Sequence, residues 1–334
     1  MLQSIDMIWG IAIALFLGGY VCDGKFEENT GKDNFQCYKG VFAILVMLHH
    51  ISQRIEGQFL KIFLYVGSMS VAVFMLLSGY GIMVSYKKKN NISLKWYLIK
   101  VLRLYIPWFI CFIIKILDGL IPGQPKWNFT ISWFILAMTF LYFSFAVSFN
   151  NKLTFLMKII ILTCLCLVWN LGVGYMIAIG KTNIFMSSSL GTWWTWPVLA
   201  FPVGVLWGNY KNKINKIISN KKVSMTTMIL LIILLNVCIR KSSNQYYNIL
   251  TDLIFSGICI IGITWSKLSN PVLHWIGKYS MEFFIVHTLY MDIINVEPFA
   301  LTGELSYVIV LIILTVITMI PIKFVSDKII KLVR

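Results

Sequence analysis

The sequence predicts an all-α fold, a polytopic bundle of about eleven transmembrane helices. Hydrophobic residues make up 58% of the 334 residues and charged residues only 13%. In soluble proteins, hydrophobic residues make up about half of the chain and charged residues about a quarter. The apolar residues gather into stretches of about 20, the length of helix that crosses a bilayer. We therefore expect a single membrane domain over 1–334, with an extra N-terminal span and cytoplasmic loop at 1–34 and a helical core at 35–330.

The expected spans follow one another closely along the chain. The first has Asp6 and no lysine ahead of it. It lacks the basic start of a signal peptide, so we interpret it as retained in the protein. In chain order the spans lie near 5–22, 37–53, 61–84, 97–117, 130–149, 153–174, 190–208, 224–239, 248–266, 273–294 and 304–326.

The basic residues indicate the orientation of the bundle. Lysine and arginine total 29, against 13 acidic residues, and most of them fall in alternate connections between spans. Basic connections stay in the cytoplasm, which predicts an N-terminus outside and a cytoplasmic C-terminus. The net charge of +16 is then explained by topology and by attraction to membrane lipids, and we expect no nucleic-acid partner.

Ionisable side chains inside the bilayer are costly and need a reason. His50 follows Lys39 by eleven residues. If the segment is one helix rising from the cytoplasm, His50 lies about 16 Å above that lysine, near the middle of the membrane. His287 follows Lys278 by nine residues and reaches a similar depth of about 14 Å on the same assumption. Glu282, on the same segment, must face a partner or water.

A lone histidine in a membrane helix has another explanation, a hydrogen bond that fixes helix packing. The matching depth of His50 and His287, above a basic floor of Lys39, Lys100 and Arg103, favours a shared site. Two histidines and one glutamate could bind zinc, but they lack the close spacing of a zinc site, so we expect no metal.

Four segments, in order, carry a resemblance to a known family. They are Lys39 followed by His50 after ten intervening residues, "VFMLLSGYGI" (73–82), "RLYIP" (103–107) and "GKYSMEFFIVH" (277–287). Over about 35–330 the chain resembles the acyltransferase 3 family of bacterial integral-membrane O-acyltransferases, which modify surface polysaccharides and related glycans.

This resemblance implies a donor and an acceptor. The donor would be acyl-CoA, most often acetyl-CoA, and the acceptor a hydroxyl of a cell-surface polysaccharide or of its lipid-linked precursor, at the bacterial cytoplasmic membrane. Lys39, Lys100 and Arg103 would bind the donor, and the guanidinium fork of Arg103 suits phosphate best.

The resemblance also implies roles at the reacting centre. His50 is expected to act as general base, since imidazole titrates near the working pH. His287 would orient the acceptor or stabilise the oxyanion, with Glu282 or a backbone carbonyl fixing its tautomer. Exchanged roles and an acyl-histidine intermediate stay open. Trp133, near the outer end of its span, is expected either to line the entrance for the acceptor or to anchor its helix in the interfacial aromatic belt.

Two other functions remain as alternatives. A transporter or flippase for a glycan or lipid also has many spans and buried charges, although the inverted repeats typical of such proteins are not evident in the sequence. The protein could also pass acyl groups across the membrane to a separate transferase. The acceptor sugar and the oligomeric state stay open, with a homo-oligomer as one alternative.

Overall fold

The computed structural model describes residues 31–55, 60–89, 92–121, 131–150, 152–180, 191–266, 268–294 and 304–333. These residues form helices and turns, with no strand among them. The span expected at 5–22 lies outside the described residues. The helices are α2 (Lys32–Ser52), η1 (Leu60–Phe63), α3 (Gly67–Lys89), α4 (Leu94–Asp118), α5 (Trp133–Phe149), α6 (Phe155–Ala178), η2 (Thr192–Trp194), α7 (Ala200–Asn209), α8 (Lys211–Ser219), α9 (Lys221–Arg240), α10 (Gln245–Trp265), α11 (Pro271–Lys278), α12 (Ser280–Ile293) and α14 (Glu304–Val333).

Length and composition identify the helices that can cross a bilayer. Within the described ranges, six helices are long and apolar enough: α3, α4, α6, α9, α10 and α14. Helix α5 is apolar but shorter. The all-helical class and the multi-pass membrane character expected from the sequence are therefore confirmed.

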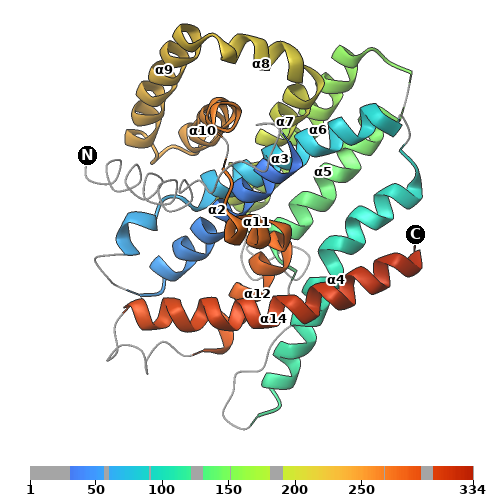
Figure 1. Ribbon diagram of the computed structural model, residues 1–334, viewed down its shortest axis with the longest axis vertical. Coiled ribbons are helices and arrows are strands. Elements are labelled where there is room, and N and C mark those ends of the chain that lie inside the picture. The colour runs from blue at the N-terminus through green and yellow to red at the C-terminus, as the bar shows by residue number, and fades with distance from the viewer. Residues whose placement is uncertain are drawn as a thin grey trace.

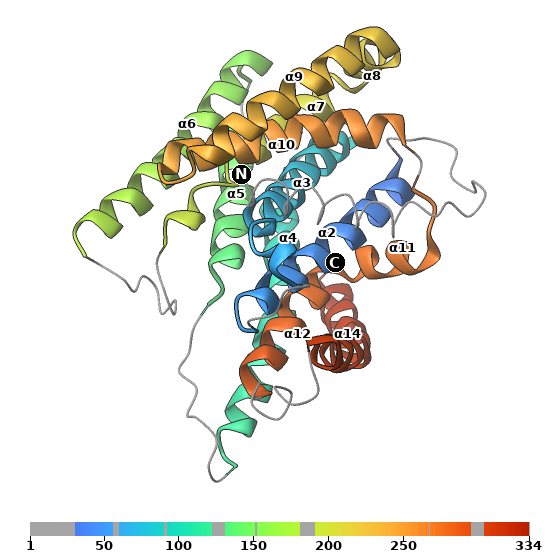
Figure 2. The ribbon, with the colours of Figure 1, turned by 90° about the vertical axis from the view of Figure 1, so that its left-hand side faces the viewer.

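Helices α2 and α3 lie at the centre of the bundle (Figure 1). Helices α9 and α10 lie on one side of this pair, and α12 and α14 lie on the other (Figure 2). Helix α3 packs most closely on α7, and α2 on α11. A Cβ atom at Gly204 of α7 would collide with the carbonyl of Leu76 on α3. Only glycine permits this approach, as the small residues of membrane helix contacts generally do.

The span expected at 273–294 is instead two helices, α11 and α12, which is a correction to the sequence analysis. Pro271 opens α11, and the side chain of Asn270 accepts hydrogen bonds from the first backbone N–H groups. The helix ends at Lys278, with Tyr279 as its C-cap, and it packs closely against α2 through Gly277, which lies on the carbonyl of Gln36. The estimate of depth from Lys278 to His287 assumed one straight helix and was wrong on that point.

The segment expected at 190–208 as one span also differs. Its described part, from residue 191, forms the short η2 and the ten-residue α7.

An ion-pair cluster joins α2, α4 and α12 near the end of α12. Arg54 Nη2 lies 2.8 Å from Asp292 Oδ1, and Lys115 Nζ pairs with the other carboxylate oxygen. The Arg54 guanidinium also donates to the carbonyl of Met291. These bonds fix the C-terminal end of α12 beside the end of α2, one turn beyond the histidines.

Candidate active site

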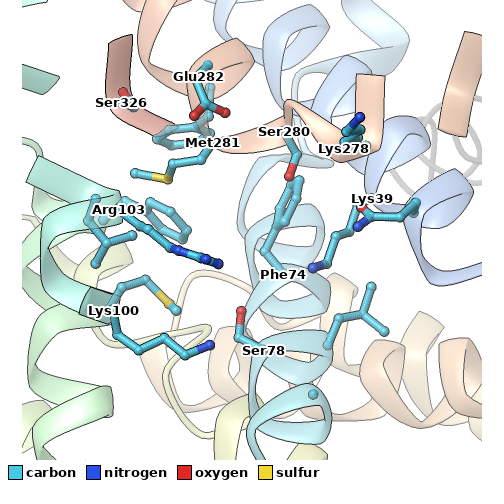
Figure 3. A pocket seen from close by; sticks show the side chains of 18 of the residues that line it. Lys39, Phe74, Ser78, Lys100, Arg103, Lys278, Ser280, Met281, Glu282 and Ser326 are labelled. Atoms are coloured by element: carbon cyan, nitrogen blue, oxygen red, sulfur yellow. The ribbon is translucent and has the colours of Figure 1, made fainter. Parts of the chain in front are cut away.

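A cavity of about 360 Å³ lies between α2, α3, α4, α5, α11, α12 and α14, and we call it the basic cavity. Its described lining includes five cationic side chains: Lys39, Lys100, Arg103, Lys278 and Lys323. The charged ends of Lys39, Lys100 and Arg103 point toward one another across it (Figure 3). The basic floor expected from the sequence thus forms one site, supplied by separate helices.

Little in the lining offsets this positive charge. Among the described lining residues, Glu282 is the one acidic side chain, and it is 2% exposed. Its Oε1 lies 3.4 Å from Nζ of Lys323. Lys100 Nζ lies over the rings of Trp96 and Tyr142, at 5.9 and 5.8 Å from their centroids. Aromatic faces attract a cation without neutralising it. The cavity therefore keeps a net positive charge and suits a polyanion.

The two histidines that the sequence placed at equal depth lie side by side. The rings of His50, in the last turn of α2, and His287, on α12, are stacked with centroids 5.5 Å apart and planes at 29°. His49 is 5.3 Å from His50 but is held separately, since its Nδ1 lies 3.3 Å from the carbonyl oxygen of Phe63. His50 and His287 thus lie side by side as expected, with His49 tied to the backbone beside them.

Hydrogen bonding fixes the tautomer of His287. Its ring is fully buried, and Nδ1 lies 3.0 Å from the carbonyl oxygen of Phe283. A carbonyl only accepts, so Nδ1 carries the proton and Nε2 keeps a lone pair. Nε2 has no hydrogen-bond partner in the described part of the chain. The backbone carbonyl, and not Glu282, therefore orients this imidazole.

A second cavity, of about 700 Å³, lies beside His50, and we call it the histidine cavity; His287 is not part of its described lining. His49, His50, Gln53 and Ser68 contribute polar groups to its lining. Three tryptophans also line it: Trp133, Trp193 and Trp196. Trp133 stacks on Trp194 with centroids 6.2 Å apart, so its ring is held in place. Aromatic rings and neutral hydrogen-bonding groups together are suited to a sugar.

The family model of an acyltransferase domain, acyltransferase 3, matches residues 33–324. The chain belongs to the acyltransferase 3 family. A comparison with curated proteins and one with solved structures each found no significant match. Membership establishes acyl transfer at a membrane as the general activity of this acyltransferase.

The four segments behind the resemblance lie around the two cavities of the acyltransferase. Lys39, in the N-terminal half of α2, lines the basic cavity, and His50, in its last turn, lines the histidine cavity. This one helix therefore connects the two cavities. Ser78 and Arg103 line the basic cavity from α3 and α4. The fourth segment spans the break between α11 and α12 and places Lys278 in the basic cavity.

Some lining residues of the acyltransferase were not singled out by sequence reasoning. Lys278 and Lys323 looked like ordinary topological lysines. Lys278 belongs to the family segment 277–287, which was a usable signal. Lys323 follows Pro321 in a long apolar helix, and only packing shows that it meets Glu282.

Proposed function

We propose that this acyltransferase moves an acyl group, most often acetyl, from acyl-CoA to a hydroxyl of a cell-surface polysaccharide or of its lipid-linked precursor, at the bacterial cytoplasmic membrane. The observation that carries the proposal is the stacked pair of His50 and His287 beside two cavities of opposite character, one cationic and one neutral and aromatic. A transferase that joins a charged donor to a neutral sugar needs two such compartments.

The proposal includes a topology with about eleven spans, the N-terminus outside and the C-terminus in the cytoplasm, following the distribution of basic residues. Acyl-CoA is made inside the cell, so the basic cavity opens to the cytoplasm. The opposite end of the site carries Arg54 and Lys115, and these share the carboxylate of Asp292. The unbalanced positive charge therefore gathers at the inner face.

The donor is bound first by its phosphates. Arg103 can hold two phosphate oxygens with its planar fork, whereas Lys39 and Lys100 act as point charges. A neighbouring hollow of about 460 Å³ is also lined by Arg103 and Lys323, and it adds Lys328 and Lys331. The cationic surface is thus large enough for a donor with several phosphates, and the pantetheine arm then extends toward the histidines.

The chemistry is a direct transfer. His50 lines the cavity from which the acceptor arrives, so it takes the proton of the attacking hydroxyl. The hydroxyl oxygen bonds to the acyl carbon, the C–S bond breaks, and the departing thiolate of CoA receives the proton from the imidazolium. His287 is fully buried and is in the described lining of neither cavity, so its contribution is to hold the stacked ring of His50 in place beside the acceptor.

The test uses membranes that contain the full chain together with the glycan acceptor, incubated with radiolabelled acetyl-CoA. We expect His50→Ala to lower label transfer at least about a hundredfold, the usual contribution of a general base. His274→Ala is the matched control, because His274 lies on α11 and pairs with Asp33 at 3.2 Å, away from both cavities. Transfer that survives in folded His50→Ala protein would remove this residue from the mechanism.

The same assay separates the alternatives. A transporter would give no labelled glycan with the wild-type chain at any donor concentration. An acyl shuttle would give labelled glycan in whole membranes and none when purified protein is supplied with the extracted glycan alone.

A further inference from the structure

The two cavities of the site approach each other closely without joining. On α3 the lining of the histidine cavity ends at Val71, and that of the basic cavity begins at Phe74. On α5 consecutive residues divide in the same way, with Trp133 in the histidine cavity and Phe134 in the basic cavity. Three helical residues span about 4.5 Å. The wall between the cavities is therefore one side chain thick at this level.

That side chain is Phe284. Among the described residues it is the single one that lines both cavities. It is 6% exposed, its ring lies 4.7 Å from that of Phe134, and it meets the ring of His287 edge-on at 5.7 Å. It precedes His287 by three residues on α12, so the two rings share a helix face. Phe284 stands directly on the path from the cationic groups to the histidine pair.

We propose that Phe284 is the gate between the donor and acceptor compartments, and that it sets the length of acyl chain that reaches His50 and His287. This inference depends on the proposed function. The thioester of a donor held in the basic cavity must pass this ring to meet the acceptor. An acetyl group is short and displaces the ring least, whereas each additional methylene must occupy space that the ring fills. Buried cores resist added methylenes because they are closely packed.

The inference predicts a specificity change that a purely structural role would not produce. Replacing Phe284 by alanine joins the two cavities and removes the obstacle. Transfer of butyryl relative to acetyl should rise at least about tenfold, the discrimination that one or two methylenes provide in an apolar pocket. Phe284→Leu should give a smaller rise, and Phe284→Trp should lower acetyl transfer. All three variants should still bind acetyl-CoA, because the cations of the basic cavity remain.

The experiment incubates acceptor-containing membranes with radiolabelled acetyl-, propionyl- and butyryl-CoA and compares the ratio of label transferred. Phe255→Ala is the matched control, since Phe255 is also buried, on α10, and packs edge-on against Phe42 away from both cavities. The control should keep the wild-type ratio. An unchanged ratio in Phe284→Ala and Phe284→Leu, with both proteins folded and binding acetyl-CoA, would overturn the gate. Wild-type membranes that transfer no acyl group at all would instead overturn the proposed function.

Discussion

The basic cavity and the histidine cavity lie on either side of one aromatic ring, yet their linings are chemically opposite. The described lining of the basic cavity holds five cations and one carboxylate. The described lining of the histidine cavity has no lysine, arginine, aspartate or glutamate, and combines histidines, tryptophans, hydroxyls and amides with aliphatic side chains. Charge is thus confined to one compartment.

This division has a physical reason. A charged group is tolerated in the bundle only where water or a counter-ion reaches it. Five cations close together repel one another and are relieved when an anion binds, so the basic cavity gains most from a charged ligand. A neutral cavity has no such requirement and discriminates by shape, stacking and hydrogen bonds. If the comparison holds, substitutions in the two cavities should affect different substrates.

Among the variants that test this division, we expect the largest change in substrate binding from Lys39→Glu. The change replaces an attraction for phosphate with a repulsion, and donor binding should weaken on the order of a hundredfold. The dependence of transfer on acceptor concentration should stay as in the wild type. Titration with acetyl-CoA measures the first effect, and Lys88→Glu, an exposed lysine at the end of α3, is the control. If the variant weakened donor binding and acceptor binding equally, the two cavities would not bind separate substrates.

A smaller and opposite effect is expected from Trp133→Ala. The ring lines the histidine cavity, so its loss should raise the acceptor concentration needed for half-maximal transfer about three- to tenfold, the value of one aromatic contact. Donor binding should be unaffected. Trp265→Ala is the comparison variant, since that tryptophan is 41% exposed on α10 and bonds the carbonyl of Ile218. If Trp133→Ala weakened donor binding and left the acceptor dependence unchanged, Trp133 would belong to the donor compartment, and the assignment of the histidine cavity to the acceptor would be wrong.

The smallest effect is expected from Glu282→Gln. This change removes one of the two carboxylate partners of Lys323, the other being Asp327, and adds net positive charge to the basic cavity. Donor binding should tighten a few-fold, while the thermal stability of the purified protein falls because the buried ion pair is broken. Binding and melting curves on the same sample measure both. If transfer were lost without a change in donor binding, Glu282 would instead act in the chemical step.

Several features could be predicted from the sequence because they depend on spacing along one helix. The ten residues between Lys39 and His50 place a cation in the N-terminal half of α2 and an imidazole in its last turn. The same reasoning failed between Lys278 and His287, because α11 ends at Lys278 and α12 begins after Tyr279. Hydrophobicity alone does not distinguish one long helix from two short ones, since both are apolar throughout. The break at Tyr279, which is the C-cap of α11 and the N-cap of α12, is visible only in the structure.

The sequence by itself determined the class of molecule, the membrane, the family and the residue types at the site. These follow from composition, from the length of apolar stretches and from motif order. None of these features requires knowledge of which segments contact one another. Tertiary structure alone decided that His287 uses the carbonyl of Phe283 rather than Glu282, that Lys323 joins the cations, and that Phe284 separates the two cavities. Each of these depends on which helix faces touch, and contact between segments distant in sequence is set by packing.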